Sequence, residues 1–235
     1  MTPEDALAQL RALADPARAQ GMAEYHKAPR PYLGLTTPQI ADLAQGWREG
    51  LDIAGRGALA DALWQSDIFE ARIAAAKLLT QARMRPDAEV WALIASWVPS
   101  FDSWAIADAA AMAGQKRLVA DPARIIEVEG WTPSTHHWTR RAAMIFTLPY
   151  TKQNHPKPEE LAIRQRVLGW AAGYVHDPDW FIQKSVAWWL RELSKHDPER
   201  VRYFLQNHAK HMKPFARREA SKYLAPLPGS EAAKG

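Results

Sequence analysis

The sequence predicts an all-α protein, an α-solenoid of HEAT-like helical repeats that forms a curved, concave, basic groove. Three observations lead to this prediction. Apolar residues recur at spacings of three and four along nearly the whole chain of 235 residues. Proline and aspartate, which often start helices, mark the breaks between these segments. No segment shows the two-residue alternation of a half-buried strand, or an Asn-Gly or Asp-Gly hairpin turn.

The helical segments follow one another with short connections. The apolar spacing predicts helices, in chain order, over residues 3–14, 37–47, 53–65, 71–82, 88–98, 160–175, 181–193, 199–212 and 216–224. Helix-start signals stand at Thr37-Pro38, Pro86-Asp87, Asp121-Pro122, Pro158-Glu159 and Asp197-Pro198. Two further segments, 103–114 and 136–150, complete the series. The first, "SWAIADAAAMAG", is rich in alanine, which is a strong helix former.

The helices are expected to come in pairs that repeat. A pair with its connections occupies about 35–45 residues, which is the size of a HEAT-like repeat. Three segments read as diverged copies of one helix: "FEARIAAAKLLTQ", "HWTRRAAMIFTLP" and "WFIQKSVAWWLRE". Stacked helix pairs build one continuous core and leave a concave face for a partner. No linker rich in glycine or serine divides the chain, so we expect one domain over residues 1–224, followed by a disordered tail over 225–235.

The composition excludes several classes of protein. No apolar run approaches the roughly 18 residues that a membrane span needs, and the first residues lack the apolar segment of a signal peptide. The chain has no cysteine, which excludes disulfides, cysteine zinc sites and thiol nucleophiles. We therefore expect a cytoplasmic protein that binds no membrane. The net charge of +4 is compatible with a polyanionic partner without establishing one.

The absence of several known motifs excludes further classes of enzyme. The chain carries no Walker loop, Gly-x-Gly-x-x-Gly, Gly-x-Ser-x-Gly or His-Glu-x-x-His motif. The pairs His136-His137 and His208/His211 have no carboxylate at ligand spacing beside them, so we interpret them as solvated helix ends and predict no metal and no cofactor. The 11 tryptophans exceed ordinary usage. Because Trp buries a large area, most of them are expected in the core, and those on a polar face are of interest.

Trp188 is the first residue that helix packing does not explain. When residues 180–195 are wound as a helix, one arc gathers the apolar side chains, and Lys184, Arg191 and Lys195 fall on the opposite side with Trp188. The apolar arc consists of Ile182, Val186, Trp189, Leu190 and Leu193. Two interpretations remain open. Trp188 packs under a neighbouring helix, or it forms an aromatic surface in a basic groove that packs against nucleic acid.

Arg141 and Asp108 are the other two residues of this kind. Arg141 projects inside the apolar arc of its helix, which is formed by Trp138, Ala142, Ile145, Phe146 and Leu148. A buried guanidinium needs a carboxylate or a phosphate, so Arg141 either pairs with a buried acid such as Asp108 or clamps a phosphate oxygen. Asp108 stands one helical turn after Trp104 on an alanine-rich helix, so the two side chains share a face.

These segments, taken together, resemble the AlkD-type DNA alkylation-repair DNA glycosylases, a family built from HEAT-like repeats. The resemblance rests on "DSWAIADA", "WTRRAAMIFTL", "FIQKSVAWWLREL", the early "MAEYHKAPRPYLGLTTPQI" and the late "FARREASKYL". The match runs in the same order from about Gly21 to Leu224. The Trp-x-x-x-Asp helix and "FIQKxxxWxLRE" are its most specific parts.

The resemblance implies a role for each matching residue. The catalytic carboxylate falls on Asp108, and the two tryptophans that flank the lesion fall on Trp104 and Trp188. The groove arginine falls on Arg141, and a tyrosine near the DNA falls on Tyr25. Related sequences often have Asp where this chain has Ala105, and "THHW" precedes the arginine helix, so the lesion preference is open.

The implied activity is hydrolysis of the N-glycosidic bond of 7-alkylguanine and 3-alkyladenine in double-stranded DNA, with the lesion kept stacked in the duplex. The phosphate contacts are expected from Arg141 and from four further cations, Lys184, Arg191, Arg217 and Arg218. A monomer is the simplest expectation. Two alternatives remain: a HEAT-like scaffold that binds DNA or protein without catalysis, and a hydrolase that uses Asp108 on another substrate.

Overall fold

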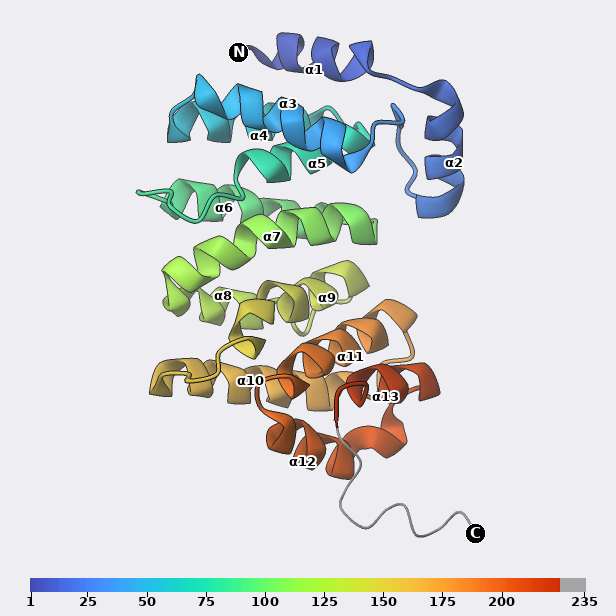
Figure 1. Cartoon of the computed structure of the whole chain (residues 1–235), viewed down its shortest axis with the longest axis vertical. Helices are drawn as coiled ribbons and strands as arrows, with labels where there is room; N and C mark the ends of the chain where they lie inside the picture. The colour runs from blue at the N-terminus through green and yellow to red at the C-terminus, as the bar shows by residue number, and fades with distance from the viewer. Residues whose placement is uncertain (225–235) are drawn as a thin grey trace. The chain divides into compact units, whose positions relative to one another are not determined.

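The computed structural model describes residues 1–224, and within them the chain is entirely helical (Figure 1). The described residues form thirteen α-helices and four short 3-10 helices, with no strand among them. The predicted all-α fold class is confirmed. The chain divides into two compact units, Met1–Trp131 and Thr132–Gly235. The predicted tail 225–235 lies outside the described residues, and a single domain over 1–224 stays a prediction.

The first unit consists of helices that follow one another in chain order (Figure 1). Its elements are α1 Pro3–Ala12, α2 Pro16–His26, α3 Thr37–Glu49, α4 Ile53–Gln65, α5 Phe69–Leu78, α6 Ala88–Trp97, η1 Val98–Ser100, α7 Trp104–Ala120, η2 Pro122–Arg124 and α8 Ile125–Gly130. Helix α5 packs against α3, α4 and α7, so it occupies the centre of this unit. The face of α5 that meets these helices is rich in small residues, and Ala71, Ala74, Ala75 and Ala76 are fully buried.

The second unit is arranged around α11 in the same way. Its elements are α9 His137–Phe146, η3 Leu148–Thr151, α10 Pro158–Tyr174, α11 Trp180–Ser194, α12 Pro198–His208, η4 Ala209–His211 and α13 Pro214–Ala220. Helix α11 contacts α9, α10, α12 and α13. The apolar arc that the sequence predicts for it, Ile182, Val186, Trp189, Leu190 and Leu193, is fully buried. The buried stripe of α11 is therefore confirmed.

Side-chain caps start many of the helices. Thr2 and Thr36 each form a capping box with the third residue of the following helix. Asp15, Asp52, Asp179 and Asp197 each accept a hydrogen bond from a backbone N–H of the first helical turn. Proline occupies the first turn of several of these helices, where its missing N–H costs nothing.

Two helices were not predicted from the sequence. Helix α2 has no buried residue, and therefore no apolar stripe that spacing could reveal. Helix α8 has only six residues, too few for periodicity to show. Helix α7 continues to Ala120, six residues beyond the alanine-rich segment that predicted it.

Polar contacts between successive repeats recur at a nearly constant sequence separation. The Trp64 indole N–H donates to the Ser100 hydroxyl, and the Trp91 indole N–H donates to the Glu127 carboxylate, each across 36 residues. Arg140 pairs with Asp177 across 37 residues. These separations agree with the predicted repeat length of about 35–45 residues. The first two contacts join repeats of the first unit, and the third joins repeats of the second.

Most tryptophans are structural, as expected. Trp47, Trp64, Trp91, Trp97, Trp138 and Trp189 are buried. The rings of Trp64 and Trp97 stack with centroids 4.3 Å apart. The other five, Trp104, Trp131, Trp170, Trp180 and Trp188, keep part of their surface accessible. No helix in the described part of the chain is long and apolar enough to cross a membrane.

Candidate functional site

A cleft of about 550 Å³ in the first unit contains Tyr25, Trp104 and Asp108 in its wall. The end of α2 and one stripe each of α3, α5 and α7 line it. The contributing side chains recur at helical spacing, as in Phe69, Ile73 and Lys77 on α5. Such a volume lies within the range of small-molecule sites. The structure therefore brings together three of the residues singled out in the sequence.

Trp104 and Asp108 occupy the first two turns of α7, on the face that lines the cleft. Both are half-buried. Ala105 and Ala109 accompany them in the cleft wall. On the other faces of α7, Ala107, Ala110, Ala111 and Ala113 are buried. The alanines of this helix thus serve two purposes: some allow close helix packing, and two leave open space beside Trp104 and Asp108.

An aromatic cluster surrounds Trp104. The ring of Tyr25 meets it edge-on with centroids 6.1 Å apart, and the His26 ring lies 5.2 Å from it. His26 also lies 4.6 Å from Phe69, whose ring stacks on Tyr32 at 4.6 Å. Edge-on and offset pairs of this kind contribute about 0.5–1.5 kcal/mol beyond their buried area. Tyr25 keeps 70% of its surface exposed, so its ring is accessible at the mouth of the cleft.

A buried carboxylate holds the loop that joins α2 to α3. The Glu70 side chain is fully buried and accepts hydrogen bonds from the backbone N–H groups of Leu33, Gly34 and Leu35, at 2.9, 2.7 and 3.3 Å. Gly34 has φ +84°, and a Cβ there would lie 2.2 Å from the Asp15 carbonyl oxygen. The turn Leu33-Gly34-Leu35 therefore requires glycine at its centre, and it places Leu35 in the cleft wall.

Ion pairs anchor the start of α7 to the same loop. Arg30 pairs with Asp102, two residues before Trp104, and with Asp67 at 2.7 Å. Arg72 pairs with Asp67 at 2.9 Å. The side chain of Arg30 is only 4% exposed, whereas that of its partner Asp67 is 54% exposed, so the network runs from the interior to the surface. This network fixes the position from which Trp104 enters the cleft.

His26 is the one histidine in the cleft wall. Burial lowers the pKa of its imidazole below the ordinary value, although the nearby charge of Glu70 opposes this shift. Within the described residues, its Nδ1 atom is buried and has no hydrogen-bond partner. A lowered pKa favours the neutral ring, so His26 adds little positive charge to the wall that contains Asp108.

In the second unit, α11 and its C-cap residue Lys195 carry a stripe of aromatic and cationic residues. Trp180, Lys184, Trp188, Arg191 and Lys195 follow at spacings of three and four. Trp188 is half-buried, as are Lys184 and Arg191. The predicted grouping of Trp188 with these cations on one face is therefore present in the structure.

Helix α13 and the residues after it contact this stripe at several points along its length. The rings of Trp180 and Phe215 stack with centroids 5.3 Å apart. Glu219 pairs with Lys184 and, at 2.7 Å, with Arg191. Further along, the Lys195 ammonium lies 4.8 Å from the Tyr223 ring centroid. Two cations expected to contact phosphates thus share one carboxylate, and they flank Trp188 along the helix.

Arg141 is buried in α9, as the sequence predicts, with 4% of its surface exposed. Its guanidinium carbon lies 5.7 Å from the ring centroid of Trp138, which is within cation–π range. The five residues of the predicted apolar arc around it are also buried. Arg217 and Arg218 lie on α13, and both are exposed.

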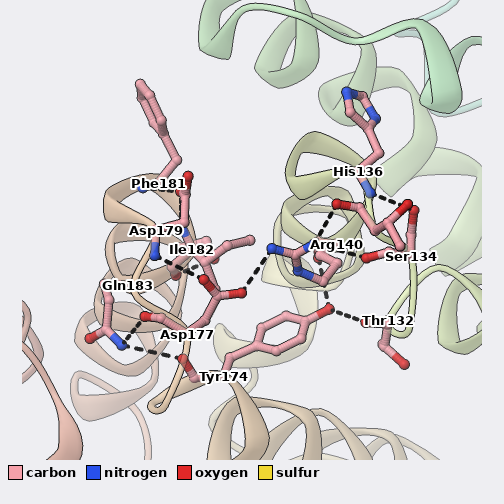
Figure 2. A network of polar contacts seen from close by, with 12 residues as sticks. Thr132, Ser134, His136, Arg140, Tyr174, Asp177, Asp179, Phe181, Ile182 and Gln183 are labelled. Atoms are coloured by element: carbon pink, nitrogen blue, oxygen red, sulfur yellow. Dashed lines mark hydrogen bonds and ion pairs between the residues drawn. The ribbon is translucent and has the colours of Figure 1, made fainter.

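A network of polar contacts fixes the ends of α9 and α11 (Figure 2). Arg140 pairs with Asp177 at 2.9 Å and also donates to the Ser134 carbonyl oxygen. The Tyr174 hydroxyl donates toward the carbonyl oxygens of Thr132 and Arg140. The buried side chain of Gln183 donates to backbone carbonyls at the end of α10, including that of Val175 at 2.8 Å. These contacts tie the helix of Arg141 to the helix of Trp188.

The nine residues singled out in the sequence therefore fall into two groups, one in each unit. The first consists of Tyr25, Trp104 and Asp108, and the second of Arg141, Lys184, Trp188, Arg191, Arg217 and Arg218. Among the described residues, no group of three or more His, Cys, Asp or Glu side chains is arranged to hold a metal ion. His176 and His211 lie with ring centroids 4.3 Å apart, a contact that the predicted pairs did not include.

The sequence did not indicate four further residues that line the cleft, His26, Arg48, Phe69 and Lys77. His26 directly follows Tyr25, and its helix had not been predicted. Phe69 and Lys77 stand two turns apart in the segment 69–81, where spacing alone places them on one face. Arg48 has no such signal, because its place in the cleft depends on how α3 packs against α5.

The chain matches a known protein family over nearly its whole length. Residues 6–224 match the family described as DNA alkylation repair enzyme. The chain belongs to this family. The match covers both units and all nine residues of the two groups, and it confirms the resemblance seen in the sequence. No curated protein matches the chain.

Solved structures share the fold of this DNA alkylation repair family member. A predicted DNA alkylation repair enzyme from Enterococcus faecalis is 22% identical, with a TM-score of 0.76, over 91% of this chain and 98% of the other. AlkD2 from Streptococcus mutans is 20% identical, with a TM-score of 0.60, over 82% of this chain and 92% of the other. At these identities the likeness establishes the helical fold.

Proposed function

We propose that this DNA alkylation repair family member is a DNA glycosylase for positively charged alkylated purines, chiefly 7-alkylguanine and 3-alkyladenine, in duplex DNA. The observation that carries the proposal is the cleft of the first unit. There a carboxylate, Asp108, shares a wall with the rings of Trp104 and Tyr25. Aromatic faces and a carboxylate stabilise positive charge, and this reaction develops positive charge on the sugar.

The proposed reaction is hydrolysis. N-Alkylation gives the purine a positive charge, so the base is already a good leaving group. The bond between the sugar C1′ and the purine nitrogen breaks, and its electron pair leaves with the base, which becomes neutral. Asp108 stabilises the oxocarbenium-like sugar and positions a water, whose oxygen bonds C1′ while one of its protons is released. Trp104 is proposed to present a ring face to the deoxyribose, for about 0.5–2 kcal/mol, and the family resemblance suggests the same role for Trp188.

Duplex binding is assigned to the basic residues of the second unit. Arg141, Lys184, Arg191, Arg217 and Arg218 are proposed to contact phosphates, and Tyr25 of the first unit is proposed to lie near the DNA. Such contacts release counterions, so binding is expected to weaken steeply as salt rises. The lesion is proposed to stay stacked in the duplex. The protein is proposed to act as a cytoplasmic monomer without a cofactor.

Base release from methylated duplex DNA tests this proposal. Wild type is expected to release free 7-methylguanine and 3-methyladenine, and Asp108→Asn to lower the rate by about 10²–10³-fold. Asp42→Asn is the matched control, because Asp42 is exposed on α3 outside the cleft. No release by wild type contradicts the glycosylase, and retained duplex binding would then favour the non-catalytic scaffold. Equal release by wild type and Asp108→Asn removes Asp108 from its role.

Trp188→Ala separates binding from catalysis. If the ring acts on the transition state, this variant lowers the rate at saturating DNA more than it lowers duplex affinity. Trp170→Ala is a suitable control, since Trp170 is another half-buried tryptophan of the second unit and lies on α10. An equal loss of rate and affinity would assign Trp188 to binding alone.

A further inference from the structure

The cleft beside Asp108 also contains cationic side chains that the proposed glycosylase reaction does not use. Arg48 and Lys77 also line it. Both are half-buried, and in the described part of the chain neither forms an ion pair with a carboxylate. Arg48 donates one hydrogen bond, at 3.3 Å, to the backbone carbonyl of Lys77, so its guanidinium lies beside the end of α5 that carries Lys77. Two half-buried cations without a counter-ion favour an anionic ligand.

The cations and the aromatic cluster lie at different positions along the same helices. Phe69 begins α5, and Lys77 stands eight residues later on the same stripe. At 1.5 Å per residue these positions are about 12 Å apart. On the cluster's side the wall offers Tyr25 and Trp104, and Asp108 follows one helical turn after Trp104 on α7. On the other side it offers Arg48 and Lys77. The rest of the lining includes the apolar Leu35, Ile40, Ala41 and Ile73 and the polar Gln45 and Thr80.

A ligand that matches this wall is flat and cationic at one end and anionic at the other. Aromatic rings beside a carboxylate favour a flat cation. Paired Arg and Lys side chains favour a phosphate. The cleft volume of about 550 Å³ lies well within the range that holds small molecules. His26, whose pKa is lowered by burial, leaves the cation-binding end without a competing positive charge.

We propose that this cleft binds a free purine mononucleotide whose base is positively charged by N-alkylation. The cationic base lies against Trp104 and Tyr25 beside the Asp108 carboxylate, and the phosphate lies between Arg48 and Lys77. The identity of the base rests on the proposed function, whereas the phosphate end rests on Arg48 and Lys77 alone. The cleft is thus a nucleotide site that operates without DNA.

Titration calorimetry of the full chain with three ligands tests this site. The ligands are 7-methyl-GMP, GMP, which lacks the positive charge on the base, and 7-methylguanosine, which lacks the phosphate. We expect 7-methyl-GMP to bind about tenfold more tightly than either of the others. Equal affinity for 7-methyl-GMP and GMP, or binding that inorganic phosphate alone reproduces, overturns the proposal.

Variants assign the two ends of the site. Arg48→Gln and Lys77→Gln are expected to weaken 7-methyl-GMP binding about tenfold and to leave 7-methylguanosine affinity unchanged, with Lys77→Arg restoring most of the loss. Asp108→Asn is expected to remove the preference for 7-methyl-GMP over GMP. Arg11→Gln is the matched control, because Arg11 is an exposed arginine on α1 outside the cleft. An equal effect of Arg11→Gln and Arg48→Gln contradicts the assignment.

The two proposals can fail separately. Base release from duplex DNA with no 7-methyl-GMP binding would refute the mononucleotide site and leave the glycosylase. Tight 7-methyl-GMP binding with no base release would refute the glycosylase and support the site. Thermal unfolding of each variant, compared with wild type, shows whether a loss of binding comes from a loss of folded protein.

Discussion

The ring of Tyr25, at the end of α2, meets the ring of Trp104, at the start of α7, edge-on with centroids 6.1 Å apart. Helix α2 buries no residue of its own, and at its end both Tyr25 and His26 contact the Trp104 ring. Tyr25 is largely exposed, whereas Trp104 is half-buried. The exposed ring therefore supports the orientation of the ring beside Asp108.

Tyr25→Ala is expected to lower base release from methylated duplex DNA by about 2–10-fold, because Trp104 loses its edge contact. Tyr25→Phe keeps the ring and is expected to retain most of the rate. Tyr25→Ala is expected to cost about 0.5–1.5 kcal/mol of stability through the lost ring contact, and Tyr25→Phe less than about 0.5 kcal/mol. The measurements are base-release rates and denaturant unfolding. A rate for Tyr25→Phe as low as that for Tyr25→Ala would assign the effect to the hydroxyl instead.

Glu219→Gln is expected to strengthen duplex binding, because Glu219 pairs with both Lys184 and Arg191 and competes with phosphate for them. We expect affinity to rise about 2–5-fold at low salt, with a steeper dependence on salt concentration. Fluorescence anisotropy with labelled duplex at several salt concentrations measures both. Glu199→Gln makes the same charge change at a side chain that is 84% exposed on α12. Matching gains in the two variants would show that net charge alone is responsible.

Gly34→Ala is expected to destabilise the chain by more than about 2 kcal/mol. The residue has φ +84°, and its Cβ would meet the Asp15 carbonyl oxygen at 2.2 Å. Gly57→Ala is the opposite case, since Gly57 lies inside α4 with nothing within 4 Å of an added Cβ. That variant should gain about 0.5–1 kcal/mol. Urea unfolding of both variants measures the difference, and a neutral Gly34→Ala would show that the turn relaxes freely.

The free energy of unfolding is expected to depend on pH through the carboxyl group of Asp87. Hydrogen bonds from Arg124, at 2.8 and 3.1 Å, lower the pKa of its carboxyl below the ordinary 3.8, with a further contribution from Arg117. In the unfolded chain the carboxyl takes up its proton at higher pH than in the folded chain. Its stabilising effect is therefore complete above about pH 4–5 and is lost as pH falls through the lowered folded pKa.

Asp87→Asn is expected to cost about 3–5 kcal/mol near neutral pH, because the buried Arg117 loses its carboxylate. The variant should also flatten the fall in stability below about pH 4. Unfolding free energies measured across this range for both proteins give the comparison. An unchanged acid slope would assign the acid sensitivity to other carboxylates.

The sequence predicted best those features that depend on the residue spacing within a single helix. The apolar arc of α11 and the burial of Arg141 follow from spacing within a single helix, and both are present in the structure. Contacts between helices were harder to foresee. The pairing of Glu219 with Lys184 and Arg191 depends on how α13 lies along α11. Likewise, Arg48 and Lys77 meet only because α3 packs against α5. Spacing could not reveal α2 either, because that helix has no apolar face.

The constant separation of the polar contacts between repeats bears on how such a chain can grow. Trp64 reaches Ser100, and Trp91 reaches Glu127, each one repeat further along the chain. A duplicated segment of that length would carry a new donor and a new acceptor at the same separation. The copied repeat would therefore form the same hydrogen bonds with its neighbours. Lengthening the chain by whole repeats keeps these bonds. Inserting part of a repeat between a donor and its acceptor would break one of them.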